Sequence, residues 1–334
     1  NQIGMASLFA SKAARSVIAA RGRRLVDFGL RRSQGQDGGL IAARSSYLAG
    51  FDGTSNVLAG RRYGIPVFGT MAHSYIMVHD REREAFEHFV QHFPKQSTLL
   101  VDTYDTIHGV ENAVAVALEM KQRGDHLQAV RLDSGDLAEL SVKAREILDR
   151  NGLKDTSIFA SGNLNEIKID QLIRADAPID AFGVGTEMVV SADAPALDVA
   201  YKLSEYDGRP RLKTSEGKLT LPGRKQIFRA IDELGGFYAD IVGLADEDAT
   251  AIAREFQRGA FKVAPLLSMH LKDGHRLTPR PTLAELREHF LQVLAKLDPR
   301  YKELEQPENY PVKLSAALDA MLSSEKMRAA KRQE

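Results

Sequence analysis

Residues 129–137, AVRLDSGDL, are the stretch that decides the fold. A short apolar strand ends in the polar cluster 133–136, and Ser134 or Asp136 can cap the helix that follows. A turn of this kind needs one cap and one glycine, so the second carboxylate, Asp133, and the arginine Arg131 serve no evident local purpose. Several other predicted strands end in the same way, and this recurrence predicts a functional site at the strand ends.

Short strands alternate with helices throughout residues 3–186. The strands are apolar without alternation, as expected for a parallel sheet that is buried on both faces. No GxGxxG motif follows any of these strands. Polar residues follow nearly every strand, whereas an open sheet would gather them at the one point where its strand order reverses. An α/β barrel is therefore favoured over an open doubly wound sheet. The predicted strands are 25–30, 65–70, 97–103, 129–134, 156–161 and 181–186, and the predicted helices are 3–20, 38–50, 54–62, 82–93, 106–123, 137–152 and 164–175.

The pattern changes near residue 198. Asp207-Gly208 predicts a hairpin, residues 237–244 and 261–271 resemble strands of a smaller sheet, and residues 282–298 and 311–330 resemble amphipathic helices. We expect three segments: an α/β barrel in residues 1–197, the β-rich part of a smaller domain in residues 198–280, and C-terminal helices in residues 281–334.

The composition excludes several classes of function. Basic and acidic residues number 45 each, so net charge gives no reason to expect nucleic acid or a membrane surface as partner. No apolar run approaches the ~20 residues that span a bilayer. The absence of cysteine excludes disulfides, a thiolate nucleophile and cysteine metal sites. A cytoplasmic enzyme acting on small molecules fits these properties best.

Each strand end offers a different chemistry. Arg31 and Arg32 can bind an anion or form surface ion pairs, and residues 51–56 form a glycine turn that suits a small anion or an ordinary helix cap. His73 is either structural or a candidate acid, base or phosphoryl acceptor. The His88/His92 pair lacks the glutamate of a zinc-protease motif and is interpreted as ordinary.

Carboxylates and glycines complete the set of polar strand ends. Asp102 and Asp105, with Asp133 and Asp136, place four acids on neighbouring strand ends, where they can hold Mg²⁺ and sugar hydroxyls. Residues 161–163 and 183–186 combine glycines with polar neighbours in a way that suits a phosphate. The combination predicts a site for a phosphorylated sugar, a metal and a small anionic co-substrate.

Ten motifs in register resemble the nicotinate phosphoribosyltransferase family. They are NQIGMASLFASKAAR, DFGLRRSQGQDG, GFDGTSNVLAG, PVFGTMAHS, VDTYDT, VRLDSGDL, FGVGTEM, YKLSEYDGRPRLK, TLPGRKQIFR and, more weakly, YPVKLSAAL. The resemblance covers nearly the whole chain. It implies a type II phosphoribosyltransferase fold, in which an irregular, TIM-like α/β barrel joins a smaller β-rich α/β domain. Family members begin before the helix that opens this chain, so we expect the smaller domain to be incomplete here.

The resemblance also implies a reaction. Nicotinate and phosphoribosyl pyrophosphate, with ATP and water, give nicotinate mononucleotide, pyrophosphate, ADP and phosphate, a salvage step of NAD biosynthesis classed as a ligase reaction. It implies Mg²⁺ and a homodimer. It implies catalytic roles for His73 (phosphorylated by ATP), Arg131 and Asp133. The implied substrate-binding residues are Phe28, Arg31, Thr54, Ser55, Asp102, Asp105, Ser134, Asp136, Gly162, Asn163, Gly185 and Thr186. Asp102, Asp105 and Asp136 would lie near the metal, and Lys213, Lys225 and Arg229 are further phosphate candidates.

Two alternatives stay open. Ser55 stands where the nicotinamide-using relatives carry Asp, and an uncharged residue there favours a carboxylate substrate. An enzyme that uses nicotinamide is nevertheless the first alternative. The second is a truncated, inactive barrel that acts only in subunit association.

Overall fold

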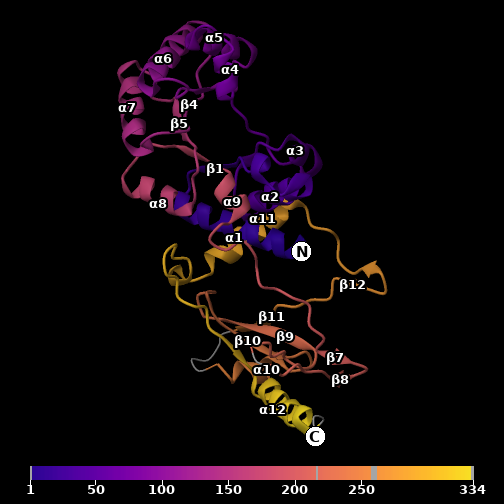
Figure 1. Ribbon diagram of the computed structural model, residues 1–334. Coiled ribbons are helices and arrows are strands. Elements are labelled where there is room, and N and C mark those ends of the chain that lie inside the picture. The colour runs from indigo at the N-terminus through magenta and orange to yellow at the C-terminus, as the bar shows by residue number, and fades with distance from the viewer. Residues whose placement is uncertain (1, 216, 257–261, 332–334) are drawn as a thin grey trace. The chain divides into compact units, whose positions relative to one another are not determined.

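The computed structural model describes residues 2–215, 217–256 and 262–331 (Figure 1). The chain divides into two compact units, one comprising Asn1–Leu197 and Leu283–Phe290, the other Asp198–Thr282 and Leu291–Glu334. The division falls inside helix α11 (Leu283–Ala295). The first turns of α11 belong to unit 1 because the Arg287 guanidinium donates to the carbonyl oxygens of Tyr47 (2.7 Å) and Gly50 (2.9 Å).

Unit 1 is built on a curled sheet of six parallel strands in the order β2-β1-β6-β5-β4-β3. This is the cyclic order of a barrel that is opened between β2 and β3. The strands are mostly buried, as their largely apolar sequences predict, and the expected TIM-like α/β architecture is confirmed as a half-barrel. The bounds are β1 Arg24–Asp27, β2 Gly53–Thr54, β3 Thr98–Leu100, β4 Ala129–Leu132, β5 Ser157–Ala160 and β6 Ala181–Val184.

The prediction of a strand at residues 65–70 is wrong, because the segment pairs at one residue only. Only a single parallel bridge forms, between Thr54 and Val67. Pro66 has no N–H to donate, so a longer ladder loses a hydrogen bond at this position. The segment therefore follows β2 as a loop.

Helices connect the strands, and their starts follow the polar residues at the strand ends. Asp105 accepts the N–H of His108 to cap α6, and Asp136 accepts the N–H groups of Ala138 and Glu139 to cap α7. Helices α6 and α7 contact β4 (Figure 1). The helices are α1 Gln2–Ala20, α2 Gly35–Ala49, α3 Val57–Tyr63, α4 His73–Met77, α5 Glu82–His92, α6 Thr106–Gln122, α7 Leu137–Arg150, α8 Glu166–Arg174 and α9 Thr186–Val190, with the 3₁₀ turn η1 at Leu30–Arg32.

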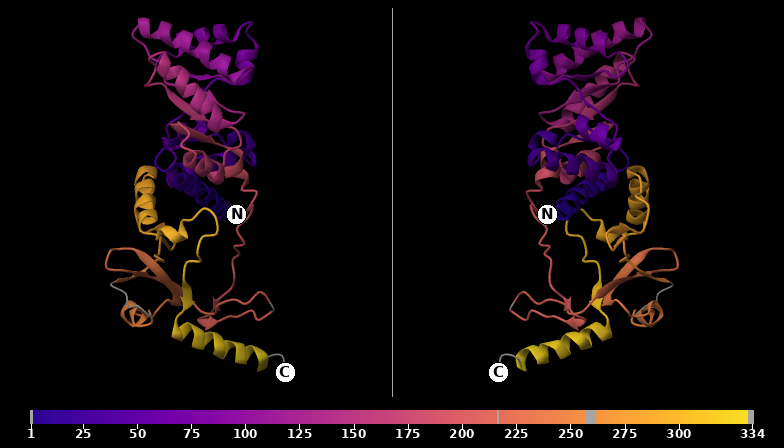
Figure 2. Two further views of the ribbon diagram at one scale, coloured as in Figure 1. Left: turned by 90° about the vertical axis from the view of Figure 1, so that its left-hand side faces the viewer. Right: turned by 90° about the vertical axis from the view of Figure 1, so that its right-hand side faces the viewer.

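Unit 2 contains a four-stranded sheet in the order β11-β9-β10-β14. Its core includes Phe228, Ile241 and Phe256, and helix α12, yellow in Figure 2, packs against β10. Two hairpins, the short helix α10, the 3₁₀ turn η2 and the end of α11 complete the described part. The bounds are β7 Glu205–Tyr206, β8 Arg209–Pro210, β9 Lys225–Ile231, β10 Phe237–Leu244, α10 Ala249–Ala253, β11 Lys262–Pro265, β12 Leu271–Lys272, β13 His275–Arg276, η2 Pro299–Tyr301, β14 Val312–Leu314 and α12 Ala316–Lys331.

The predictions for unit 2 have mixed outcomes. The hairpin at residues 207–208 and the strand at 237–244 are confirmed. Of the strand predicted at 261–271, residue 261 lies outside the described residues and only 262–265 and 271 are in strands. The helix predicted from residue 311 begins later, because residues 312–314 pair with β10 and the Ser315 hydroxyl then caps the helix. No helix in the described ranges is long and apolar enough to cross a membrane.

Candidate functional site

The carboxyl ends of the six strands of unit 1 meet at one edge of the sheet, because all six run parallel. This edge is where barrel proteins carry their active sites. Polar or aromatic residues of the predicted site follow each strand. In sheet order, from β2 to β3, the residues just past the strand ends are Ser55, Phe28, Gly185, Ser161, Asp133 and Asp102.

Arg131, on β4, organises the centre of this edge. Its guanidinium donates three hydrogen bonds, to the Asp133 carboxylate (2.5 Å), to the Ser161 hydroxyl (2.8 Å) and to the Thr70 hydroxyl (2.7 Å). The same group lies 5.2 Å from the centre of the Phe28 ring, within cation–π range. The three hydrogen bonds fix the plane of the guanidinium, so Arg131 joins the ends of β4 and β5 to the loop that follows β2.

Asp133 is held as a carboxylate by its neighbours. Burial raises the pKa of this group, but the Arg131 charge, hydrogen bonds from Ser161 and Arg131, and His73 together outweigh burial and hold the pKa below its usual value. The Ser161 hydroxyl lies 2.5 Å from Asp133 Oδ1. A fixed negative charge therefore stands at the centre of the edge at neutral pH.

His73 is the first residue of α4 and faces Asp133. Its Nε2 lies 3.6 Å from Asp133 Oδ2, and its Nδ1 lies 3.1 Å from the Thr103 hydroxyl. The ring is thus oriented by a carboxylate on one nitrogen and a hydroxyl on the other. Because 38% of the side chain is exposed, an incoming substrate can reach the ring. This geometry suits a histidine that accepts a phosphoryl group.

Asp102, just past β3, carries an unpaired buried oxygen. Its Oδ2 accepts the backbone N–H of Asp133 (2.9 Å) and the hydroxyl of Ser134 (2.5 Å). Its Oδ1 is buried and has no hydrogen-bond partner in the described part of the chain. A buried carboxylate oxygen without a partner is costly. The arrangement therefore fits a cation ligand.

The other two predicted acids serve as helix caps. Asp105 caps α6 and Asp136 caps α7, so capping accounts for both side chains. Within residues 2–215, 217–256 and 262–331, no group of three or more His, Cys, Asp or Glu side chains is placed to hold a metal ion. The four acids do not form one cage. Mg²⁺ commonly takes only one or two carboxylates from the protein and completes its shell with substrate phosphates and water. Asp102 alone can therefore supply the protein ligand.

Phe28 stands over a glycine. Its ring centre is 5.6 Å from that of Phe159, and a Cβ atom on Gly183 would lie 2.7 Å from the Phe28 ring. A Cβ atom on Gly185 would lie 2.9 Å from the Phe28 carbonyl oxygen. Both glycines of GVGT thus give room to Phe28, and the ring is positioned as one wall of the site.

Gly162 is required by the backbone of the neighbouring strand end. Its φ is +97°, and a Cβ atom would lie 1.9 Å from the Asp133 carbonyl oxygen. The following residue, Asn163, also has a positive φ, of 49°. The tight turn after β5 therefore touches the loop that presents Asp133.

Gly162→Ala is expected to lower the free energy of unfolding by roughly 3 kcal/mol or more, since it combines an unfavourable φ with a clash against backbone. Gly152→Ala is the matched control, because Gly152 has a φ of +71° with open space around it, and about 1 kcal/mol is expected there. Urea unfolding of both variants measures the difference. Equal losses would contradict the contact with Asp133.

Thr54 is buried and its hydroxyl is already engaged. It donates to Asp27 Oδ2 (2.7 Å), and Asp27 Oδ1 accepts the Gly29 N–H (2.7 Å). Burial raises the pKa of Asp27 to about 6, although the hydrogen bonds from Thr54 and Gly29 oppose this shift. Thr54 therefore joins the ends of β1 and β2 through Asp27, a residue that the sequence did not single out for the site.

Asp27→Asn is expected to flatten part of the pH dependence of stability. The folded state holds the Asp27 proton up to pH about 6 and the unfolded state only to about 3.8, so the native state binds more protons between these values and wild-type stability falls as pH rises. The loss reaches roughly 3 kcal/mol at neutral pH. Urea unfolding from pH 4 to pH 7 should show the variant gaining stability relative to wild type by up to that amount. A constant difference would contradict a raised pKa.

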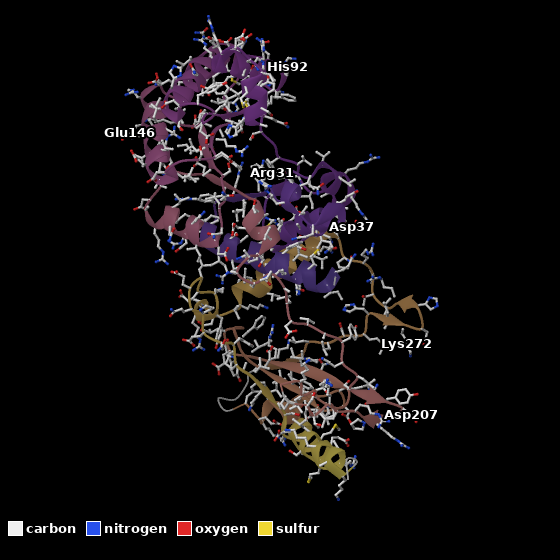
Figure 3. All side chains as sticks on the ribbon, viewed as in Figure 1. Arg31, Asp37, His92, Glu146, Asp207 and Lys272 are labelled. Carbon is white, nitrogen blue, oxygen red and sulfur yellow. The ribbon has the colours of Figure 1, made fainter. Side chains whose placement is uncertain are left out.

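Some predicted residues have no recorded side-chain contact with this cluster. Arg31 projects from η1 and is exposed (Figure 3), and the side chains of Ser55, Asn163 and Thr186 have no hydrogen bond in the described residues. Unit 2 residues are engaged elsewhere: Lys225 donates to the Leu221 and Gly223 carbonyls, and Arg229 pairs with Asp240 at 2.8 Å. Exposed Lys213 has no recorded side-chain partner in the described part.

Sequence reasoning missed Thr70, Thr103 and Phe159 as members of the cluster. It placed Ser161 in a phosphate-binding turn and not as a partner of Arg131 and Asp133. Phe159 lies on β5 and Thr103 lies shortly after β3, so their positions near strand ends were the available signal.

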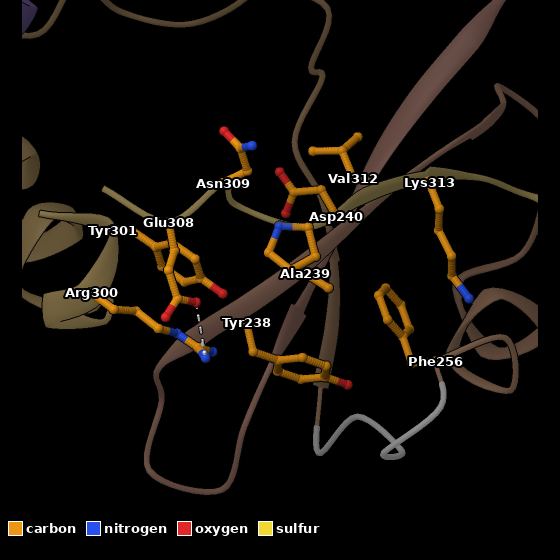
Figure 4. A pocket seen from close by; sticks show the side chains of 11 residues that line it. Tyr238, Ala239, Asp240, Phe256, Arg300, Tyr301, Glu308, Asn309, Val312 and Lys313 are labelled. Atoms are coloured by element: carbon orange, nitrogen blue, oxygen red, sulfur yellow. Dashed lines mark ion pairs between the residues drawn. The ribbon is translucent and has the colours of Figure 1, made fainter. Parts of the chain in front are cut away.

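Unit 2 has a pocket of its own, of about 470 Å³ (Figure 4). Arg300 and Glu308 form an ion pair of 3.5 Å at this pocket. No residue of the predicted site lines it, so the pocket adds nothing to the strand-end cluster. Its lining consists of Tyr238, Ala239, Asp240, Phe256, Arg300, Tyr301, Glu308, Asn309, Pro311, Val312 and Lys313.

The amino-acid sequence of this chain matches known proteins over nearly its whole length. Residues 23–220 match the profile of the Nicotinate phosphoribosyltransferase (NAPRTase) family, and residues 224–322 match its C-terminal domain. A nicotinate phosphoribosyltransferase of Mycobacterium tuberculosis H37Rv is 48% identical over 317 residues, which cover 94% of this chain and 65% of the relative. The chain thus spans about two thirds of the length of that relative.

Two solved structures resemble the fold. The crystal structure of human nicotinic acid phosphoribosyltransferase has a TM-score of 0.83 at 31% identity, covering 96% of this chain and 74% of the human chain. The structure of nicotinate-nucleotide pyrophosphorylase from Pyrococcus furiosus has a TM-score of 0.72 at 30% identity, covering 88% and 71%.

Proposed function

Because the chain belongs to the nicotinate phosphoribosyltransferase family, we propose that it transfers the phosphoribosyl group of phosphoribosyl pyrophosphate to nicotinate. The products are nicotinate mononucleotide and pyrophosphate, in a step of NAD biosynthesis that is coupled to ATP hydrolysis. The observation that carries the proposal is the cluster of His73, Arg131 and Asp133 at the carboxyl ends of the sheet.

The transfer exchanges one bond at ribose C1 for another. The bond to pyrophosphate breaks, C1 gains positive character, and the pyridine nitrogen of nicotinate forms the new bond. The Asp133 carboxylate supports this step by binding the ribose hydroxyls and by its negative charge near the developing cation. Phe28 offers a face for the pyridine ring, and Arg31 is a partner for the nicotinate carboxylate.

Phosphate groups need donors and a cation. The turns at Gly162-Asn163 and Gly185-Thr186 lie after adjacent strands, β5 and β6, and supply backbone N–H groups for the 5′-phosphate. Asp102 would hold Mg²⁺ through its unpaired Oδ1. When bound, Mg²⁺ neutralises charge on the departing pyrophosphate.

His73 provides the coupling to ATP. A ring nitrogen attacks the γ-phosphorus of ATP, ADP leaves with the bonding electron pair, and water later removes the phosphoryl group from the histidine. Thr103 and Asp133 hold the ring on opposite sides, which supports this role over that of a freely rotating surface histidine. The family also implies a homodimer and a cytoplasmic location, and both belong to this proposal.

The direct test follows mononucleotide formation by the purified chain. It is incubated with phosphoribosyl pyrophosphate and Mg²⁺, with nicotinate or nicotinamide, in the presence and absence of ATP. Product from the acid alone, increased by ATP, is the expected result. Product from the amide would transfer the function to the nicotinamide-using alternative, and no product from either would favour a barrel that acts only in subunit association.

Ser55→Asp is expected to lower kcat/KM for nicotinate at least roughly tenfold and to raise it for nicotinamide, because a carboxylate at this strand end repels a carboxylate substrate. Ser11→Asp on the exposed face of α1 adds the same charge away from the strand ends. The ratio of the two kcat/KM values is the measurement. An unchanged ratio in Ser55→Asp would remove Ser55 from the determinants of specificity.

A further inference from the structure

A basic hollow lies at the amino ends of the strands of unit 1, at the opposite edge of the sheet from the candidate site. Its volume is about 510 Å³. It is formed by the turn before β1, by α7, and by the turns that precede β5 and β6. The lining residues are Gly22, Arg23, Arg24, Arg145, Lys154, Pro178, Ile179 and Asp180.

The charges in the basic hollow are not balanced. Four cationic side chains face one carboxylate. Arg145 is largely engaged, since its Nε donates to Asp149 and its two terminal nitrogens donate to the carbonyl oxygens of Thr156 and Leu153. The Asp180 carboxylate accepts the Ile158 N–H through Oδ2 (2.7 Å). No cation of the hollow pairs with it in the described part of the chain.

Three cations of the basic hollow retain donors. Arg23 makes one hydrogen bond of 3.3 Å to the Ala177 carbonyl oxygen. Arg24 and Lys154 are exposed, and neither side chain has a partner among the described residues. Arg23 and Arg24 are neighbours at the start of β1, and the fold brings Lys154, 130 positions after Arg24, to the same hollow. Like charges collected in this way repel one another, and a multivalent anion relieves the repulsion of all of them together.

We propose that the basic hollow binds a small anion that carries two or more phosphate groups. A single phosphate ion would leave most of a 510 Å³ hollow empty, whereas this volume is in the range of small-molecule sites. Arg24 and Arg23 supply planar donors that match phosphate oxygens, and Lys154 supplies a point charge from the facing turn. The site is independent of the function proposed for the strand-end cluster.

Acetylation of Lys154 gives a readout that the strand-end cluster does not affect. The full chain is treated with an acetylating reagent, and the rates at Lys154 and at exposed Lys121 are measured by mass spectrometry. Pyrophosphate, ATP and inorganic phosphate are compared at equal ionic strength. A bound polyphosphate is expected to slow acetylation of Lys154 about tenfold when its concentration is ten times Kd, and to leave Lys121 unchanged.

Variants decide whether protection comes from the basic hollow. Arg24→Gln is expected to abolish protection while leaving Lys154 available as reporter, and Arg150→Gln, which removes the same charge outside the hollow, is expected to keep it. Protection by ATP and pyrophosphate alike would assign the polyphosphate as the ligand, and protection by ATP alone would assign the nucleotide. Equal slowing at Lys154 and Lys121, protection that survives in Arg24→Gln, or no protection at millimolar concentrations would each overturn the proposal.

Discussion

Asp133→Asn is expected to lower kcat/KM for nicotinate mononucleotide formation by roughly 10²–10³-fold. The substitution keeps the shape of the side chain but removes the negative charge beside ribose C1. It also leaves the Arg131 guanidinium without its carboxylate partner at 2.5 Å. The pKa of Asp133 lies below its usual value, so this charge is present throughout the neutral range and the loss should not depend on pH between 6 and 8. Steady-state kinetics across that range measure both effects.

Asp136→Asn is the matched comparison for Asp133→Asn. Asn caps helices about as well as Asp, and the Asp136 side chain accepts two N–H groups of α7. The structure therefore leads us to expect kinetics and Mg²⁺ dependence within about threefold of wild type. Thermal unfolding of both variants checks that the fold is retained. Comparable losses in the two variants would return Asp136 to the metal site, and a loss of less than fivefold in Asp133→Asn would remove Asp133 from catalysis.

His73→Gln is expected to abolish the coupling to ATP. Release of ADP in the presence of both other substrates should fall more than 10²-fold, and no phosphoryl group should be retained on the protein, because the amide is not a nucleophile toward phosphorus. Formation of mononucleotide without ATP should continue, since Arg131 and Asp133 remain joined to each other. Labelled ATP followed by alkaline gel analysis detects the phosphohistidine directly.

His79→Gln serves as the control for His73→Gln. His79 lies just past α4, where its ring nitrogens face the Tyr75 carbonyl oxygen and His88, so ATP coupling should be unchanged. If His73→Gln still hydrolyses ATP at the wild-type rate, or if the label is found on His79, the assignment of His73 fails.

The sequence predicted the edge of the sheet on which the polar cluster of the candidate site lies, but not the contacts within the cluster. Parallel strands necessarily bring their carboxyl ends together, so the polar residues that follow them could be placed without coordinates. The sequence offered Asp136 both as a helix cap and as a metal ligand, and Asp105 as a metal ligand. It could not choose between the two roles, since capping and metal binding use the same residue type. Nor could it show that Thr54 faces Asp27, because two buried partners 27 positions apart leave no periodic signal.

The errors in the predicted helices and strands also arise where a local sequence pattern does not record how a segment pairs. Residues 65–70 read as a strand, yet Pro66 restricts pairing to one bridge. Residues 312–314 read as the start of a helix, yet they pair with β10 across a sequence separation that a local pattern does not record. In both places a tertiary contact or a single missing donor outweighs the propensity of the segment.

Because β1 pairs with β6, the sheet of unit 1 cannot be completed until β6 has been synthesised. Arg24 and Ala181 are direct partners although 157 positions separate them. During synthesis at about 5–20 residues per second, β1 waits roughly 8–30 seconds for this partner to emerge from the ribosome. Strands β3, β4 and β5 pair in sequence order meanwhile. The nascent chain therefore exposes one edge of β1 until β6 arrives, and this interval is when a chaperone would be most useful to it.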